Sequence, residues 1–367
     1  MSGARGERLV LLAALTAAAL GACNALVGND DVSYVASDAA APSADADART
    51  EDAPPILDGA AADSGALVAL ATEGDAGVGK VAVSGTHVYW AVEDLGQVKR
   101  MPKGGGAVET FTAAQGAVTD FAVGAAEVFV NGYGYGTSPD YKGSGAERLP
   151  FGGGAAYLPM GCPVTRFTTG IAFADPHVFY GIFKCNGDVA AGLTLVRASK
   201  ADSYSAATAS LPDAGLYQPV APSAVIAVDA NDVFMTAAGS LVRVARDLSA
   251  VRGTAGPFTQ ALAIALDPDG SAVYLREPTE LRRLVRETFA PSGLVTIDGA
   301  VTFQSEQRAQ LAVNDTFVYF SAITGLFRMN KGTFAPEKVL PGPVAGVALD
   351  ATHLYFTSGS TLYRIGL

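Results

Sequence analysis

The clearest pattern along this chain is a strand–turn–strand unit that occurs seven times. Each copy has alternating apolar residues, a short polar turn, and a second run with an apolar or aromatic centre, as in "VAVSGTHVYW" at 81–90. Alternation with a period of two predicts strands, and the short turn predicts that the two strands form a hairpin. The copies begin at residues 81, 121, 171, 226, 264, 311 and 347.

A third run follows each hairpin and carries an arginine directly before an apolar residue. Seven arginines at one repeat position favour a structural role, such as a charge-assisted hydrogen bond to a neighbouring turn, over an anion-binding site. A fourth strand then precedes the next copy, as in "KVL" at 338–340. The arginines are Arg100, Arg148, Arg197, Arg243, Arg283, Arg328 and Arg364.

Four strands in each repeat of a few tens of residues are typical of a β-propeller blade. We therefore predict an all-β fold in which residues 65–367 form a single seven-bladed β-propeller, with six or eight blades as alternatives. The last copy stops at residue 367 after its third strand, whereas residues 65–74 supply a spare strand. We expect this N-terminal strand to complete the last blade, because a closed ring has no open sheet edges.

The first copy resembles the units of YWTD and NHL propellers. Val88-Tyr89-Trp90 carries the resemblance, together with "QVKR" at 97–100 and the glycines at 104–106. Ala91 stands where the threonine of the YWTD signature belongs, and YWTD rings usually have six blades. The resemblance implies a propeller fold but no particular ligand.

Residues 1–22 have the pattern of an export signal. Arg5 and Arg8 precede an apolar run, 9–20, that is shorter than the roughly 20 residues a membrane-spanning helix needs. The run ends in "LGAC" at 20–23, which resembles a bacterial lipobox. The resemblance implies cleavage before Cys23 and lipidation of its sulfur, and an ordinary secretory signal is the alternative. Asn24 in place of an aspartate implies the outer membrane, so we expect a lipid-anchored protein of the cell envelope.

Residues 23–64 predict a disordered acidic tether rich in Ala, Asp and Pro. Between residues 24 and 64 there are nine acidic residues and one basic residue, and no strand or helix period holds. Such a segment cannot bury enough surface to offset the entropy of ordering it. The net charge of −11 also argues against nucleic acid and anionic membrane surfaces as partners, so contact with the membrane is expected through the lipid anchor only.

Cys162 and Cys185 remain after the lipobox cysteine, and an even pair in an exported chain predicts a disulfide. No second group of ligands accompanies them, so we expect no metal and no cofactor. The glycine runs at 102–106 and 150–154 and the "DPDG" at 267–270 predict hairpin turns, because no phosphate-binding or calcium-loop continuation follows them.

The histidines are weak candidates for catalysis. All three open the second strand of a copy, a position that other copies fill with Glu127, Asp232 or Phe317, so imidazole is not required there. A catalytic side chain is expected at a unique position of a ring, and we predict no catalytic residue. The histidines are His87, His177 and His353.

The most irregular segment is "NGYGYGTSPDYKGSG" at 131–145. Tyr133, Tyr135 and Tyr141 lie there among glycine and serine, a composition common at recognition surfaces. We interpret it as a candidate binding loop, with a plain exposed insertion as the alternative.

These patterns predict an exported lipoprotein whose propeller is a non-catalytic binding module for a protein or glycan of the envelope. One alternative is a structural component of an envelope assembly. The other is a propeller enzyme, of lyase or lactonase type, that uses the central channel. We expect no enzyme, because no set of His, Asp or Glu converges at non-repeating positions of the sequence.

Overall fold

The computed structural model describes residues 65–367 except 75, 114–116, 134–144, 155, 159–167, 184–192, 201–205, 212–224, 238, 259 and 298–308. These residues belong to one compact unit, Leu57–Leu367. The segments expected to be an export signal and a tether, with Cys23, lie outside the described residues, as do Cys162, Cys185, Tyr135 and Tyr141.

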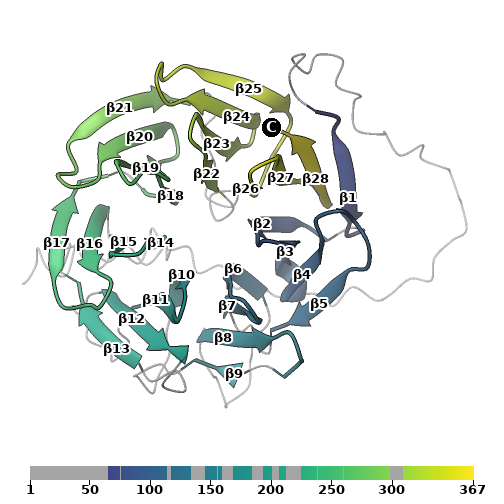
Figure 1. The fold of residues 1–367 in the computed structure, drawn as a ribbon, viewed down its shortest axis with the longest axis horizontal. Helices are drawn as coiled ribbons and strands as arrows, with labels where there is room; N and C mark the ends of the chain where they lie inside the picture. The colour runs from purple at the N-terminus through teal and green to yellow at the C-terminus, as the bar shows by residue number, and fades with distance from the viewer. Residues whose placement is uncertain are drawn as a thin grey trace, which may run out of the picture. The chain divides into compact units, whose positions relative to one another are not determined.

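Seven four-stranded antiparallel sheets form a ring, which confirms the all-β fold and the seven blades (Figure 1). Blade 1 contains β2 (Val78–Val83), β3 (His87–Val92), β4 (Gln97–Pro102) and β5 (Glu109–Thr112). Blade 2 contains β6 (Ala117–Val123), β7 (Glu127–Tyr133), β8 (Gly145–Pro150) and β9 (Ala156–Tyr157). Blade 3 contains β10 (Thr168–Ala174), β11 (His177–Phe183), β12 (Leu193–Ser199) and β13 (Ala206–Ser210).

The second half of the ring repeats the same order. Blade 4 contains β14 (Ile226–Val228), β15 (Asp232–Ala237), β16 (Ser240–Ala245) and β17 (Val251–Ala255). Blade 5 contains β18 (Ala263–Leu266), β19 (Ala272–Arg276), β20 (Glu280–Val285) and β21 (Pro291–Thr296). Blade 6 contains β22 (Leu311–Val313), β23 (Phe317–Ala322), β24 (Gly325–Asn330) and β25 (Pro336–Pro341). Blade 7 contains β26 (Val347–Leu349), β27 (His353–Ser358), β28 (Thr361–Gly366) and β1 (Val68–Thr72).

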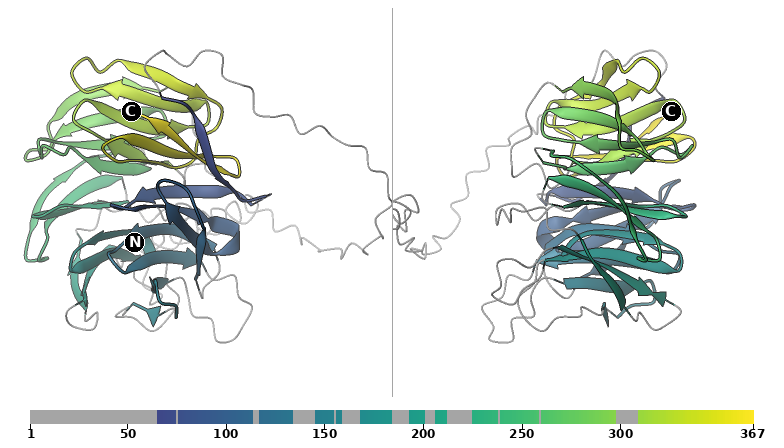
Figure 2. Two further views of the ribbon diagram at one scale, coloured as in Figure 1. Left: turned by 45° about the vertical axis from the view of Figure 1, so that its right-hand side comes forward. Right: turned by 90° about the vertical axis from the view of Figure 1, so that its left-hand side faces the viewer.

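The N-terminal strand closes the ring, as the sequence predicts. β1 pairs antiparallel with β28, with Val68 opposite Arg364 and Thr72 opposite Thr361. Figure 2 shows β1, in purple, beside the yellow strands of the C-terminal blade. A short 3₁₀ helix, η1 (Glu93–Leu95), joins β3 to β4. Within the described residues, no helix is long and apolar enough to cross a membrane.

A three-residue row crosses every blade at the same register. An alanine of the first strand lies opposite an aromatic residue of the second strand, which lies opposite the repeated arginine of the third. Side-chain volume rises from the axis outward, which suits blades that converge at the centre and separate at the rim. The rows are Ala82–Tyr89–Arg100, Ala122–Phe129–Arg148, Ala172–Phe179–Arg197, Ala227–Phe234–Arg243, Ala265–Tyr274–Arg283, Ala312–Tyr319–Arg328 and Ala348–Tyr355–Arg364.

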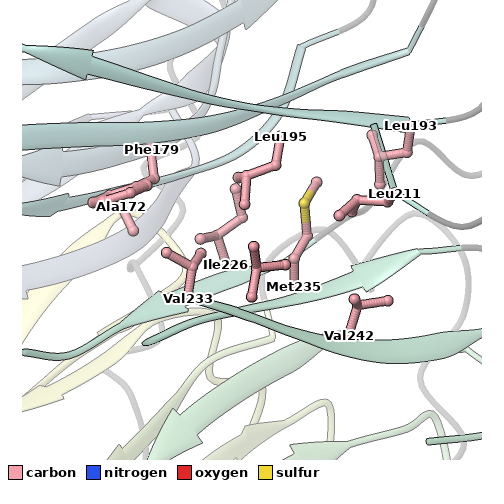
Figure 3. Close-up of a cluster of buried hydrophobic side chains, with 10 residues drawn as sticks. Ala172, Phe179, Leu193, Leu195, Leu211, Ile226, Val233, Met235 and Val242 are labelled. Carbon is pink, nitrogen blue, oxygen red and sulfur yellow. The ribbon is translucent and has the colours of Figure 1, made fainter. Parts of the chain in front are cut away.

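The hydrophobic core lies between neighbouring blades. In the cluster between blades 3 and 4, Phe179 and Leu195 pack with Val233, Met235 and Val242, all buried (Figure 3). Because each interface is built from two sheets of the same repeat, the ring is stabilised by seven similar apolar layers.

Candidate functional site

The first strands of the blades contact one another in order around the axis. The residue before the first apolar residue of each repeat therefore lies at the same end of these innermost strands, and we call these seven residues the rim positions. In most blades the rim position is small or apolar, and three blades place a polar side chain there. The rim positions are Lys80, Asp120, Gly170, Val225, Ala263, Gln310 and Gly346.

Asp120 joins three blades at the rim. Its Oδ1 accepts a hydrogen bond from its own neighbour Phe121 N at 2.8 Å and pairs with Lys80 Nζ of blade 1. Its Oδ2 accepts from Ile171 N of blade 3 at 2.8 Å. The side chains of Lys80 and Asp120 are 26% and 21% exposed, so solvent reaches both partners of this ion pair.

Lys80 is held from a second side. Its ammonium lies 5.6 Å from the centroid of the Phe121 ring, a cation–π distance. The Asp120 carboxylate and the Phe121 ring together hold the long Lys80 side chain, which would otherwise move freely in water. The ammonium of Lys80 therefore has a defined position next to Asp120.

Gln310 makes the corresponding bridge on the opposite side of blade 1. Its Oε1 accepts from Val347 N of blade 7 at 3.1 Å and from Val81 N of blade 1 at 2.8 Å, and its Nε2 donates to Val81 O at 3.2 Å. The amide reaches across blade 7 because the rim position there is Gly346. A Cβ on Gly346 would lie 2.8 Å from Gln310 Oε1 and 2.5 Å from Gly79 O.

Hydroxyl side chains satisfy the backbone behind the rim. Thr236, Ser321 and Thr357 accept hydrogen bonds from the N–H groups of the rim residues of their own blades, at 2.9, 3.1 and 2.8 Å. Thr357 also donates to Gly79 O of the next blade at 2.7 Å. These bonds hold the rim backbone of blades 4, 6 and 7, and fixed backbone of this kind helps a site to position reacting groups.

The rim can perform acid–base chemistry. A carboxylate can accept a proton, and an adjacent ammonium can donate one or stabilise negative charge that develops on a bound molecule. Among the described residues, no group of three or more His, Cys, Asp or Glu could hold a metal ion.

The histidines lie at the other end of the strands. β3, β11 and β27 begin at His87, His177 and His353, each directly after the turn that follows a first strand. His87 Nδ1 is 2.8 Å from Thr86 Oγ1, and His353 Nδ1 is 2.7 Å from Thr352 Oγ1. These contacts are local to the turns and far along the strand from the rim.

Three of the repeated arginines donate hydrogen bonds to the following blade. Arg197, Arg243 and Arg364 donate to the carbonyl oxygens of Arg246, Arg286 and Lys103, each in the turn after the third strand of the next blade. Arg100 and Arg328 instead pair with Glu109 and Glu337 of their own fourth strands. In these three blades the repeated arginine thus bonds to a neighbouring turn, as the sequence analysis predicts.

Sequence reasoning missed Lys80, Asp120 and Gln310. Their signal is a departure from the repeat, because the aligned units read K, D, G, V, A, Q and G at the rim position. Of the residues of the candidate binding loop, Tyr133 ends strand β7 and the other two tyrosines lie outside the described residues.

No protein-family model and no curated protein matches the sequence. Among solved structures, the chain is similar to selenomethionine-substituted virginiamycin B lyase from Staphylococcus aureus. The TM-score is 0.60 and the sequence identity 13%, and the match covers 82% of this chain and 98% of that chain. A likeness at this identity establishes the seven-bladed propeller fold, whereas the similarity to YWTD and NHL units stays a resemblance.

This comparison overturns the expectation of a non-catalytic binding module. This solved structure is that of a lyase, which favours the alternative of a lyase-type propeller over the binding module. The expectation of no enzyme rested on the absence of a set of His, Asp or Glu at non-repeating positions. The rim instead brings a single aspartate, Asp120, together with a lysine at such positions.

Proposed function

We propose that this protein is a propeller enzyme of the lyase class whose active site is the rim around Lys80 and Asp120. The observation that carries the proposal is the ion pair of these two residues, which occupies rim positions that are small or apolar in most other blades. The structural likeness to a lyase, over 82% of this chain, supports the reaction class.

The pair suits an elimination. The Asp120 carboxylate takes a proton from a carbon next to a carbonyl group, and the electron pair of that C–H bond forms a C=C bond as the bond to the leaving oxygen breaks. The Lys80 ammonium gives a proton to that oxygen, and proton transfer from Asp120 to Lys80 restores the pair. General acid–base assistance of this kind contributes about 10²–10⁴-fold in rate.

Neighbouring groups position the pair. The N–H groups of Phe121 and Ile171 hold the carboxylate of Asp120 in one orientation. Gln310 fixes the first strand of blade 1 next to Lys80 by its two bonds to Val81. We expect changes at Gln310 to alter the placement of Lys80.

Turnover of a substrate panel tests the proposal. Virginiamycin B is the first compound, followed by esters and glycosides with a leaving oxygen β to a carbonyl group. A conjugated C=C bond absorbs in the ultraviolet, and an elimination leaves the summed mass of the products equal to that of the substrate, whereas hydrolysis adds one water. A panel on which the protein produces no unsaturated product counts against the lyase class.

Variants then test the residues. Asp120→Asn and Lys80→Met should each lower kcat by about 10²-fold or more, with an unchanged circular dichroism spectrum. Glu109→Gln is the matched control, since it removes an exposed carboxylate on an outer strand and should keep full activity. Full activity in Asp120→Asn would place the chemistry elsewhere.

We also propose that the protein is exported and anchored to the outer membrane of the cell envelope by lipid on Cys23, its only contact with the membrane, and that Cys162 and Cys185 form a disulfide. The basic start, apolar run and lipobox-like end of residues 1–23 support this. Cys23→Ser should move the protein from the membrane fraction to the soluble fraction. Mass spectrometry of the unreduced protein should show one peptide pair linked through Cys162 and Cys185.

A further inference from the structure

Arg276 is a buried arginine that departs from the repeat. It is the last residue of β19 and has no exposed surface. The side chain lies at the interface of blades 5 and 6, where its guanidinium carbon is 6.0 Å from the centroid of the Phe320 ring. The equivalent residues of the other blades are smaller and uncharged, and they are Ala91, Asn131, Gly181, Thr236, Ser321 and Thr357.

One end of the guanidinium is fixed by backbone carbonyls. Nη1 donates to Glu277 O and, at 3.4 Å, to Glu280 O, both in the β19–β20 hairpin. Among the described residues, neither Nε nor Nη2 has a hydrogen-bond partner. These two N–H groups point in the same direction, so a whole edge of the planar group is without an acceptor.

The same edge binds carboxylates elsewhere in this chain. Arg100 donates to Glu109 Oε2 through Nε at 3.2 Å and through Nη2 at 2.7 Å. Arg282 donates through Nε to Glu277 and through Nη2 to Glu280. Arg282 therefore engages the two carboxylates nearest in sequence to Arg276, which leaves the edge of Arg276 to another acceptor.

Nothing in the repeat requires a cation at this place. The other blades show that a small side chain is sufficient there, and burying an unpaired charge is unfavourable. Burial lowers the pKa of Arg276 to about 10, so the guanidinium still carries its charge at neutral pH. A buried donor pair without an acceptor requires an explanation, and a bound anion is one.

We propose that the Nε–Nη2 edge of Arg276 binds the carboxylate group of a small ligand at the interface of blades 5 and 6. Two parallel N–H groups match the two oxygens of a planar carboxylate, as they do in bidentate arginine–carboxylate pairs. Arg276 lies opposite the rim residue Ala263 of its own blade, and the proposed binding does not depend on the proposed reaction.

Thermal unfolding tests the site with acetate as the probe. The midpoint Tm is measured in acetate, phosphate and chloride at equal ionic strength and pH, since a ligand that binds the folded state raises Tm with its concentration. We expect acetate to raise Tm by a few degrees over chloride in the unaltered protein. We expect no difference between acetate and chloride for Arg276→Met or for Arg276→Lys, which keeps a charge but has no fork.

Two further measurements make the test specific. Arg328→Met, which changes an arginine paired with the exposed Glu337, should keep the full acetate response. In the unaltered protein labelled with ¹⁵N-arginine, acetate should shift one Nε–H resonance, and that resonance should be missing from Arg276→Lys. This spectrum keeps the test valid even if Arg276→Met does not fold.

Three results would overturn the proposal. One is an equal Tm of the unaltered protein in acetate and chloride. The second is an acetate response that persists in Arg276→Lys. The third is a response to phosphate with none to acetate, which would assign the edge to a tetrahedral anion.

Discussion

Glu73 Oε1 accepts a hydrogen bond of 2.9 Å from Trp90 Nε1, and its second carboxylate oxygen pairs with Lys99 Nζ. Glu73 directly follows the closing strand β1 of blade 7, whereas Trp90 and Lys99 belong to blade 1. The Glu73 carboxylate therefore joins blade 7, which β1 completes, to blade 1, which the chain enters next.

Replacing this carboxylate should weaken the closed ring. We expect Glu73→Ala to lower the free energy of unfolding by about 2–3 kcal/mol, because it removes two hydrogen bonds of a charged group and leaves Trp90 Nε1 without its acceptor. The Glu73 side chain is 8% exposed. Glu109→Ala, at a side chain 49% exposed, is the matched control and should cost less than about 1 kcal/mol. Urea denaturation gives both values, and equal losses would contradict the role of Glu73.

Gly346→Ala should disturb the rim. The added Cβ would lie 2.5 Å from Gly79 O and 2.8 Å from both Val81 N and Gln310 Oε1, and two of these atoms belong to backbone that cannot move aside easily. Overpacking of this kind costs about 1–3 kcal/mol. Gly85→Ala is the control, because a Cβ there meets no atom within 4 Å. If the two variants have the same urea midpoint, the packing of Gly346 has been misjudged.

Because of Asp350, the free energy of unfolding should fall at acid pH. Burial alone raises the pKa of its carboxyl group, but hydrogen bonds from Lys103 and from the N–H groups of Thr352 and His353 outweigh burial and hold the pKa below the ordinary value of 3.8. A carboxylate with a depressed pKa in the folded state adds stability above its unfolded pKa, and this stability is lost as the pH falls towards the folded value.

The measurement compares unfolding free energies between about pH 5 and pH 2. We expect Asp350→Asn to be less stable at pH 7 and to lose less stability over this acid range than the unaltered protein. Lys103→Met removes the same ion pair, 2.7 Å long, from the other partner and should reduce the acid dependence in part. Parallel pH profiles for the unaltered protein and Asp350→Asn would refute the prediction.

Asp232 balances several cations on blades 4 and 5. The carboxylate has no exposed surface and pairs with Arg243 at 2.9 Å, Arg252 at 2.7 Å and Arg286 at 2.9 Å. Asp232→Asn leaves these guanidinium groups close together without the charge between them. Arg243 keeps its pair with Glu287, and Arg286 keeps its pair with Asp229. We therefore expect a loss of about 3 kcal/mol at low salt, the lower end for breaking a buried ion pair.

Salt separates this explanation from simple loss of packing. Added sodium chloride should recover part of the stability of Asp232→Asn, since it screens the repulsion between the arginines. Glu337→Gln, at a carboxylate 51% exposed that pairs with Arg328, should change little at any salt concentration. Calorimetry over a salt series provides the test, and a loss that is independent of salt would contradict it.

The blades could be predicted because their signals are local. Each hairpin can be recognised within about ten residues, because apolar residues alternate and a polar turn separates the two strands. The alanine, the aromatic residue and the arginine recur at fixed positions of this repeat, so they lie opposite one another in every blade. The closing strand could be predicted because the last unit lacks a strand that the first segment supplies.

The rim could not be predicted in the same way, because its contacts depend on the closed ring. Lys80 and Asp120 are 40 residues apart, and Gln310 bonds to Val81 across 229 residues. The sequence around one residue of such a pair does not indicate which distant residue it contacts. The sequence does show that these positions carry residue types that differ from those of most other repeats. Arg276 likewise differs from the smaller, uncharged residues at the same position of the other repeats.

The order of the strands has a consequence for how the protein is made. β1 is synthesised before every other strand of the ring, yet its partner β28 comes last, and the Thr72–Thr361 contact joins residues 289 apart. At about 5–20 residues per second, a growing chain would keep β1 without its partner for roughly 15–60 s. Six blades can assemble from near neighbours in that interval, whereas the seventh must wait for both ends of the chain. The slowest and most exposed moment of folding is therefore expected at the seam between β1 and β28.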